Sequence, residues 1–572
     1  MGDLRNTFIA IILSVGILLG WQMYFAPKPQ PKPVASATQS TADSTAPAVA
    51  ADGTAAVPND NGSPSVPGPV AGPRLPIRTS HLHGEIALTG LRFDDITLAT
   101  YHETTDPSSP EITLLSSASA PKPYYAEEGW IAADTATKVP GSDTVWTAED
   151  PNATLTDTTP VVVTWDNGDG LHFKRTIHVD QNYLFTTEQT VENHSDKAVT
   201  LYPYALVTRL DKPDSTADLR SYDGPLGVFD RTEKDVKYND LKKSGRETME
   251  STGGWIGITN KYWLTAVAFD QSMKVVGSFN HTMTGARDRF QTDLRGEALT
   301  LQPGESKAVK SYVFAGAKEL RLLDAYSADP GISRLDLAID FGWFNFLTKP
   351  LLYALIWLKG AVGNFGLAIL ALTIILRLLM FPIANKQYAS MNKMKLLQPK
   401  MKALQTRYAD DKAKLNQEMM DLYKREKVNP VSGCLPIFIQ IPIFFALYKV
   451  LYISIEMRHA PFYGWIHDLS ASDSTTIFNL FGLFPFTPPA FIPHIGVLAI
   501  VYGITMFLQQ RMSPPPDPTQ ARIMLFMPLM FTFIMATFPA GLLIYYIWSN
   551  TLGILQQWAL LRAHSTPATS KL

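Results

Sequence analysis

The chain has 572 residues, of which 46% are hydrophobic, with 50 lysines and arginines, 52 aspartates and glutamates, and one cysteine. This length predicts several domains or one large one, and a single cysteine excludes an intramolecular disulfide. The formal net charge of −2 is a sum of opposite parts, because residues 26–350 hold 30 basic and 42 acidic side chains and the remainder holds 20 and 10. Such asymmetry indicates that the two parts occupy different environments.

The amino-terminal 80 residues predict an anchor and a tether. Residues 7–25 are uncharged, apolar and long enough to cross a bilayer as a helix, with Trp21 and Tyr24 near the outer end. A cleaved signal peptide is the alternative, but no small-x-small cleavage site precedes Pro27. We therefore expect an uncleaved anchor over residues 1–26 with a short cytoplasmic amino terminus. Residues 27–80 are rich in proline, alanine, serine and threonine and predict a disordered linker.

Residues 81–330 predict an all-β domain. Short segments of alternating hydrophobicity, such as residues 161–165 and 185–191, end in clusters of Asn, Asp and Gly, which is typical of antiparallel strands in packed sheets. The histidines lack the spacing of a metal site, and the chain has no nucleophile elbow, zinc-protease or phosphate-loop motif. We expect a binding or scaffolding domain outside the cytoplasm, with no metal, no cofactor and no enzymatic activity.

Residues 331–562 predict the membrane part. Five apolar segments follow one another, and with the anchor they make six spans: residues 365–381, 435–455, 491–510, 523–538 and 542–561. The loop 386–427 carries eleven basic and five acidic side chains, whereas the loop 456–475 carries one and three. The positive-inside rule therefore places the first loop and both termini in the cytoplasm and the acidic β domain outside.

The basic loop 386–427 predicts a cytoplasmic helical hairpin. Apolar residues recur at helical spacing on both sides of Asp410 and Asp411, and this stripe is expected to hold the two helices together. The hairpin residues that we single out are basic: Lys393, Lys395, Lys400, Lys402 and Arg407. This basic face is suited to anionic lipid or RNA, although charge that only sets the topology would look the same.

Arg377 lies inside an apolar segment, where a charge costs roughly 2.5–3.5 kcal/mol on insertion scales. Two explanations stay open, because the side chain could snorkel to the cytoplasmic headgroups or line a water-filled pocket open to the cytoplasm. The predicted spans hold no acidic residue, which weighs against ion-coupled transport. Polar residues that could line such a pocket, or could instead form hydrogen bonds between packed helices, are Thr373, Gln440, Tyr545, Tyr546, Asn550 and Gln557.

Several motifs, in this order, make the chain resemble the YidC family: MNKMKLLQPKM (391–401), KVNPVSGCLPIFIQIPIF (427–444), WIHDLS (465–470), FPAG (538–541) and YYIWSN (545–550). The resemblance implies a polytopic α-helical membrane protein with a periplasmic β-supersandwich, located in a bacterial inner membrane. It also implies an insertase and chaperone for nascent membrane proteins, acting alone or beside the Sec translocase. The partners to be expected on this resemblance also include phospholipid and, through the cytoplasmic loops, the ribosome, but no DNA.

The resemblance also implies roles for individual residues. It implies that Arg377 is the arginine of a hydrophilic groove, that Thr373 is its neighbour, and that Gln440, Tyr546 and Gln557 occupy groove or substrate-contacting positions. Gly553 departs from this pattern, because a small hydroxyl residue is expected there. The tail 563–572 is short and weakly basic.

Two other classes of function remain open from the sequence. A solute transporter or channel would carry inverted repeats and intramembrane carboxylates, and neither is visible. A membrane-anchored periplasmic protein that binds carbohydrate is the other alternative, because β-supersandwiches also occur in carbohydrate-active proteins.

Overall fold

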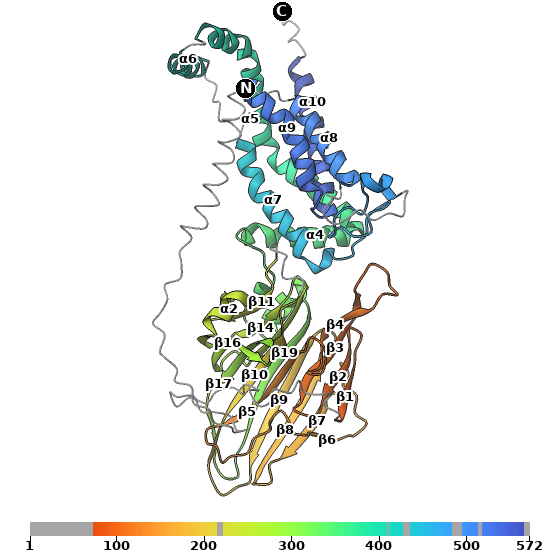
Figure 1. The fold of residues 1–572 in the computed structure, drawn as a ribbon, viewed down its shortest axis with the longest axis vertical. Helices are drawn as coiled ribbons and strands as arrows, with labels where there is room; N and C mark the ends of the chain where they lie inside the picture. Colours follow the sequence, from red (N-terminus) through yellow and green to blue (C-terminus); the bar gives the residue numbers. More distant parts are fainter. Residues whose placement is uncertain are drawn as a thin grey trace, which may run out of the picture. The chain divides into compact units, whose positions relative to one another are not determined.

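The computed structural model describes residues 72–213, 221–408, 411–426, 435–482, 495–512 and 518–565 (Figure 1). The predicted anchor 1–26, the linker as far as residue 71, Cys434 and most of the tail 563–572 lie outside these residues. The described chain divides into an amino-terminal part built of strands and a carboxyl-terminal part built of helices.

The strands form two antiparallel sheets. The first runs in the order β1-β2-β3-β5-β10-β17-β16-β13, with β4 beside β3 and β18 beside β10. Its strands are β1 (Arg74–Arg78), β2 (Leu82–Ala87), β3 (Arg92–His102), β4 (Glu111–Leu115), β5 (Tyr124–Ala132), β10 (Val199–Leu210), β13 (Arg246–Thr252), β16 (Lys274–Thr284), β17 (Arg287–Gly296) and β18 (Leu299–Leu301).

The second sheet runs in the order β12-β11-β14-β15-β19-β9-β8-β7-β6. Its strands are β6 (Thr147–Ala148), β7 (Val161–Asp166), β8 (Leu171–Val179), β9 (Leu184–Asn193), β11 (Gly224–Phe229), β12 (Thr232–Asp235), β14 (Trp255–Thr259), β15 (Trp263–Phe269) and β19 (Ser306–Ala317).

The two sheets pack against each other as a sandwich. The rings of Phe93 in β3 and Phe185 in β9 meet edge to face with centroids 5.1 Å apart. Tyr124 of the first sheet donates a hydrogen bond of 2.9 Å to the carbonyl of Ile258 in the second. Alternating apolar side chains from both sheets fill the space between them. The predicted all-β domain is therefore confirmed as a sandwich of two antiparallel sheets.

The first sheet begins before the predicted boundary at residue 81. Residues 74–78 lie in the segment predicted as linker, but they form β1, which pairs with β2 from Arg74 opposite Ala87 to Arg78 opposite His83. Leu75 and Ile77 are buried, so this segment has enough apolar side chains to join the core, although it contains Pro76. Strand pairing therefore outweighs the linker-like composition of residues 74–78.

Short helices connect the sandwich to the helical part. They are α2 (Tyr238–Ser244), α3 (Leu320–Ala328), the 3₁₀ turn η2 (Leu335–Ala338) and α4 (Asn345–Val362). Lys349 of α4 forms ion pairs with Asp324 at 2.9 Å and Asp336 at 2.8 Å. These contacts join α4 to α3 and η2 directly.

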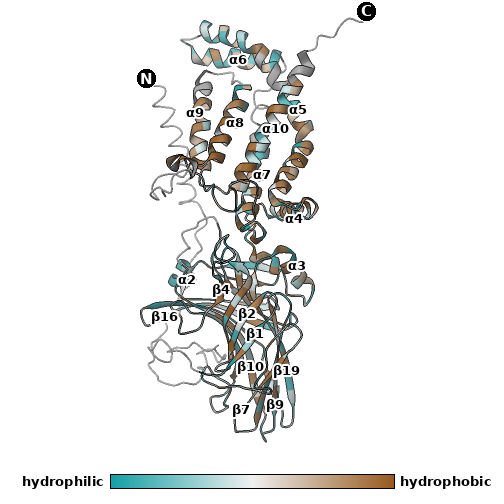
Figure 2. Cartoon of the chain, turned by 90° about the vertical axis from the view of Figure 1, so that its right-hand side faces the viewer, coloured by the Kyte–Doolittle hydropathy of each residue, from teal (hydrophilic) through white to brown (hydrophobic). Residues whose placement is uncertain are grey.

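The helical part contains α5 (Phe365–Arg407), α6 (Lys412–Arg425), α7 (Leu435–Ile453), α8 (Val497–Met512), α9 (Pro518–Met535) and α10 (Ala540–Ser565). Helix α10 packs on α5 and α8, and α9 packs on α8. Among the described residues, the segment Phe365–Gln387 of α5 is long and apolar enough to cross a membrane. The segments Gln440–Ile453, Val497–Met512 and Met524–Met535 are apolar but shorter. Figure 2 shows hydrophobic residues along these helices.

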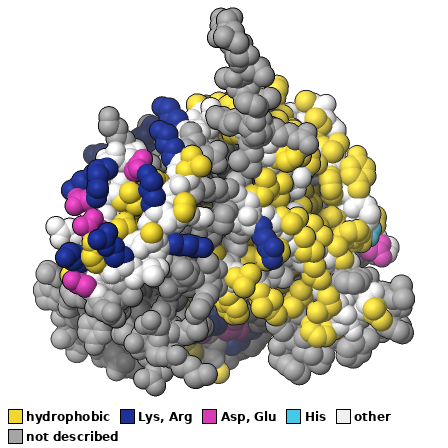
Figure 3. Space-filling view, turned by 90° about the horizontal axis from the view of Figure 1, so that it is seen from above, with side chains coloured by type: hydrophobic (Ala, Val, Ile, Leu, Met, Phe, Trp, Pro, Cys, Tyr) yellow, Lys and Arg dark blue, Asp and Glu magenta, His cyan; other side chains and the backbone are white. Residues whose placement is uncertain are grey.

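The cytoplasmic hairpin predicted at 386–427 is formed by the end of α5 and by α6. Its first arm is not a separate helix, because α5 continues for 43 residues through Pro382 and Pro399. Leu397, Met401 and Leu422 form a small core between the arms, so the apolar stripe holds the hairpin together as predicted. Seen from above in Figure 3, charged side chains gather on one side of the face and hydrophobic side chains cover much of the rest.

Candidate functional site

Arg377 of α5 is bound to α10. Its Nε donates a hydrogen bond of 3.1 Å to Ser549 Oγ, and its Nη2 donates bonds of 2.9 Å to Ser549 Oγ and 2.6 Å to the Ser549 carbonyl. The side chain is partly buried rather than fully extended into solvent. The guanidinium is therefore held against a neighbouring helix.

Two further hydrogen bonds join the helices around Arg377. Gln440 Nε2 of α7 donates to Tyr545 Oη of α10 at 3.2 Å. Asn550 Nδ2 of α10 donates to Thr505 Oγ1 of α8 at 3.2 Å. Polar side chains from four helices thus come together in this region. We call this group the polar cluster: Arg377, Gln440, Thr505, Gln509, Tyr545, Ser549 and Asn550.

Tyr546 lies next to the polar cluster among aromatic rings. Its ring centroid is 5.6 Å from that of Phe444, 5.9 Å from that of Tyr502 and 5.0 Å from that of Tyr545. Its hydroxyl oxygen is buried and has no hydrogen-bond partner among the described residues. Because such a group loses its hydration without compensation, Tyr546 Oη is a position where an incoming polar group would be stabilised.

Two predicted site residues donate hydrogen bonds to backbone carbonyls, one within α5 and one from α10 to α8. Thr373 is buried, one turn from Arg377, and its hydroxyl donates to the carbonyl of Ile369 at 2.6 Å. Gln557 is buried and its Nε2 donates to the carbonyl of Met512, at the end of α8, at 2.9 Å. These are the packing contacts that serine, threonine and glutamine make in helical bundles.

Ser549 is the residue that the sequence did not single out. It appears in the YYIWSN motif, but nothing in the sequence links it to Arg377, which precedes it by 172 positions. The one feature of the sequence that could have pointed to Ser549 is its spacing, three residues after Tyr546 and four after Tyr545. A serine at that spacing shares their helix face.

The hairpin side chains Lys393, Lys400, Lys402 and Arg407 are exposed, and the side chain of Lys395 lies outside the described residues. Lys400 Nζ pairs with Glu426 Oε1 at 2.7 Å and so connects the two arms. An exposed pair of this kind contributes at most about 1 kcal/mol. The basic side chains are therefore accessible at the surface of the hairpin.

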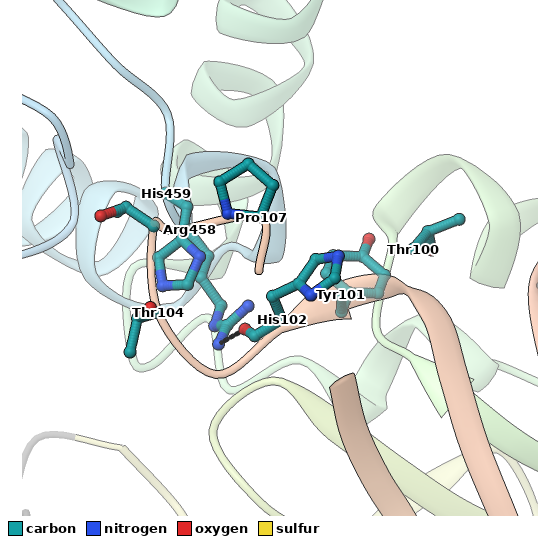
Figure 4. Close-up of a pocket in the computed structure, with 8 residues that line it drawn as sticks. Thr100, Tyr101, His102, Thr104, Pro107, Arg458 and His459 are labelled. Atoms are coloured by element: carbon teal, nitrogen blue, oxygen red, sulfur yellow. Dashed lines mark hydrogen bonds between the residues drawn. The ribbon is translucent and has the colours of Figure 1, made fainter. Parts of the chain in front are cut away.

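A separate pocket of about 230 Å³ lies near the start of the loop after α7 (Figure 4). Arg458 and His459 line it together with residues of β3 and of the segment that follows β3. Arg458 Nη2 donates to the His102 carbonyl at 2.6 Å. Burial and the adjacent Arg458 lower the pKa of His459, which keeps its imidazole neutral at pH 7. No group of three or more metal-ligating side chains occurs in the described parts of the chain.

Comparisons with known proteins place these features in context. Residues 74–354 match the model of the YidC periplasmic domain, and residues 357–567 match that of the 60Kd inner membrane protein. The chain is 46% identical to the membrane protein insertase YidC of Methylorubrum extorquens (strain PA1), covering 98% of this chain and 95% of that protein. It is 47% identical to that of Rickettsia conorii (strain ATCC VR-613 / Malish 7), covering 97% and 98%.

Among solved structures, the chain is similar to one titled as an active YidC insertase with the first transmembrane domain resolved. The TM-score is 0.36 at 17% identity, covering 87% of this chain and 93% of that one. A galactose mutarotase-like protein from Lactobacillus casei ATCC 334 matches with a TM-score of 0.26 at 10% identity, covering 42% and 99%.

Proposed function

Because this chain belongs to the YidC family of membrane protein insertases, we propose that it inserts nascent proteins into a bacterial inner membrane and helps them fold, with the polar cluster as its substrate site. The observation that carries this proposal is Arg377, a cation within the apolar segment of α5 that is held by the uncharged groups of Ser549. A cation so placed attracts an acidic group that has to leave water.

The proposed insertion has a polar part and an apolar part. The polar tail of the substrate enters the polar cluster from the cytoplasm, where Arg377 and the other polar groups replace some of its hydration. The apolar segment moves along α7 and α9, which carry exposed apolar side chains: Ile441, Phe445, Leu525, Phe526, Leu529 and Phe533. Burial in lipid supplies about 0.8 kcal/mol per CH₂, so no nucleotide or cofactor is required.

The finer topology is part of the proposal. Six spans with both termini in the cytoplasm and the β domain in the periplasm agree with the loop charges. The hairpin then faces the cytoplasm, where its exposed basic side chains can meet the ribosome or anionic headgroups. The Sec translocase is proposed as a partner for substrates with large external domains.

A transporter or channel is the second candidate, and the charge pattern of the helices disfavours it. The sequence has no acidic residue within the predicted spans, whereas coupled transporters usually carry intramembrane carboxylates. In the described part of the β domain, no contact favours the carbohydrate-binding alternative.

Arg377→Ala tests the role of the cation. We expect the variant, in proteoliposomes, to insert a substrate with an aspartate-rich translocated tail roughly 10- to 100-fold more slowly, because a charge-assisted hydrogen bond contributes about 1.5–3 kcal/mol. Insertion of the same substrate with asparagines in the tail should change little. Arg377→Lys should keep part of the preference because it keeps the charge.

Arg511→Ala is the matched control, because Arg511 lies at the end of α8 and contacts the ring of Phe507. Equal insertion of acidic and neutral tails by the wild type and by Arg377→Ala would refute the proposed role.

A further inference from the structure

Two small residues of α10 form the surface that Arg377 contacts. Ser549 receives three hydrogen bonds from the guanidinium, of 2.6 to 3.1 Å. Gly553 lies four residues later, one turn along the helix, and so on the same face. Small residues at this spacing let another group approach a helix backbone closely.

A side chain at position 553 would crowd the guanidinium. A Cβ atom added to Gly553 would lie 3.2 Å from Arg377 Nη2 and 3.3 Å from Nη1. It would also lie 3.1 Å from Gln509 Nε2 of α8. These distances are shorter than ordinary carbon–nitrogen contacts, so a side chain at this position would require the guanidinium or the Gln509 amide to shift by a few tenths of an ångström.

Ser549 orients the guanidinium without adding charge. Both of its accepting atoms, Oγ and the backbone carbonyl, are uncharged, and the residue is only 5% exposed. Water therefore competes weakly for these bonds. An aspartate at the same position would bind the guanidinium more strongly but would neutralise it.

We propose that Ser549 and Gly553 form a positioning seat for Arg377, which fixes the guanidinium against α10 and preserves its positive charge for an acidic group of the substrate. This inference rests on the proposed function of Arg377. It also accounts for glycine at 553, where the family resemblance led us to expect a hydroxyl residue. Ser549 provides the hydroxyl one turn earlier, and Gly553 provides the space that the guanidinium needs.

The proposed contact between Ser549 and Arg377 can be tested without measuring insertion. In nanodiscs with ¹⁵N-labelled arginine, the Arg377 Nε–H should exchange with solvent about tenfold faster or more in Ser549→Ala, because its hydroxyl acceptor is gone. Thr551→Ala is the matched control, since Thr551 lies two residues away on α10 and its hydroxyl donates to the Ile547 carbonyl. An unchanged exchange rate of the Arg377 Nε–H in Ser549→Ala would contradict the proposal that Ser549 positions the guanidinium.

The effect of Ser549 on insertion is tested with the two substrates used for Arg377→Ala, one with an aspartate-rich tail and one with asparagines in the tail. We expect Ser549→Ala to slow acidic-tail insertion about three- to tenfold, Ser549→Thr to restore it, and Ser549→Asp to slow it as much as Arg377→Ala. Gly553→Ala should have a smaller effect of the same kind. In the Arg377→Ala background, Ser549→Ala should cause no further loss, because a positioning residue acts only through the group that it positions.

The outcomes separate the two proposals. An additional loss in the double variant, or equal slowing of both tails by Ser549→Ala, would show a merely structural role and overturn the inference. If the Arg377 signal responds to Ser549→Ala but Arg377→Ala shows no preference between tails, the seat stands and the proposed function fails.

Discussion

Asp293 of β17 is a buried carboxyl group in the sandwich, only 2% exposed. Its Oδ1 accepts hydrogen bonds from Asn280 Nδ2 at 2.6 Å and Gln291 Nε2 at 3.1 Å. Burial raises the pKa of Asp293 to about 6, although these bonds and the nearby Arg246 and Arg289 favour the charged form. The native state therefore binds a proton more tightly than the unfolded chain does.

This pKa predicts how the stability of the sandwich depends on pH. Between about pH 4 and pH 6 the folded domain holds a proton that the unfolded chain has lost, so its free energy of unfolding should fall as the pH rises, by about 3 kcal/mol in total. Asp293→Asn should remove this contribution and make the dependence less steep. Pulse proteolysis of the full chain in urea, scored on fragments of the sandwich, measures it. A variant with the wild-type slope would contradict the assignment.

The sequence reveals some of these residues and hides others. Arg377 is conspicuous because a charge within an apolar segment has few explanations. Ser549 is hidden, because serine is common in membrane helices and only the packing of α5 against α10 gives it a partner. Thr373 carries the same polar signal as Gln440, Asn550 and Gln557, and only the structure separates its hydrogen bond within α5 from the bonds that the other three make between helices.

Helices and strands are predicted with different success. The stripe of methionine, leucine and tyrosine predicts the hairpin, and its small core confirms it. The continuity of α5 is not evident, because Pro382 and Pro399 each remove a backbone hydrogen bond and usually kink or end a helix. Period-two patterns predict the β structure, but the order of strands in each sheet depends on contacts between distant segments.

The hairpin core predicts a local change in stability. Leu422→Ala should destabilise the hairpin by about 2 kcal/mol, since Leu422 is 9% exposed and packs with Leu397 and Met401. Amides of α6 should then exchange with deuterium roughly 30-fold faster. Leu396→Ala is the control, because Leu396 lies in the other arm of the hairpin, next to Leu397 on α5, and is 77% exposed. Equal effects of both variants would show that the stripe does not hold the arms together.

For the whole molecule, the net charge of −2 conceals two parts of opposite net charge. The acidic excess lies in residues 26–350, which include the sandwich, and the basic excess lies in the remainder. The basic hairpin and the partly buried Arg377 account for most of this excess of positive charge. This division follows from the sequence, whereas the meeting of the polar residues from α5, α7, α8 and α10 requires the packed structure.

Capture of a nascent chain at the polar cluster tests the central claim most directly. A photoreactive amino acid is placed at Gln440 or Tyr546 of the full chain in membranes, and at Thr248, an exposed residue of β13, as the control. Ribosome-bound membrane-protein chains of increasing length are then translated and irradiated. We predict adducts from Gln440 and Tyr546 once the first apolar segment has left the ribosome, and none from Thr248. Insertion without adducts at either position, or equal adducts from all three, would contradict the account.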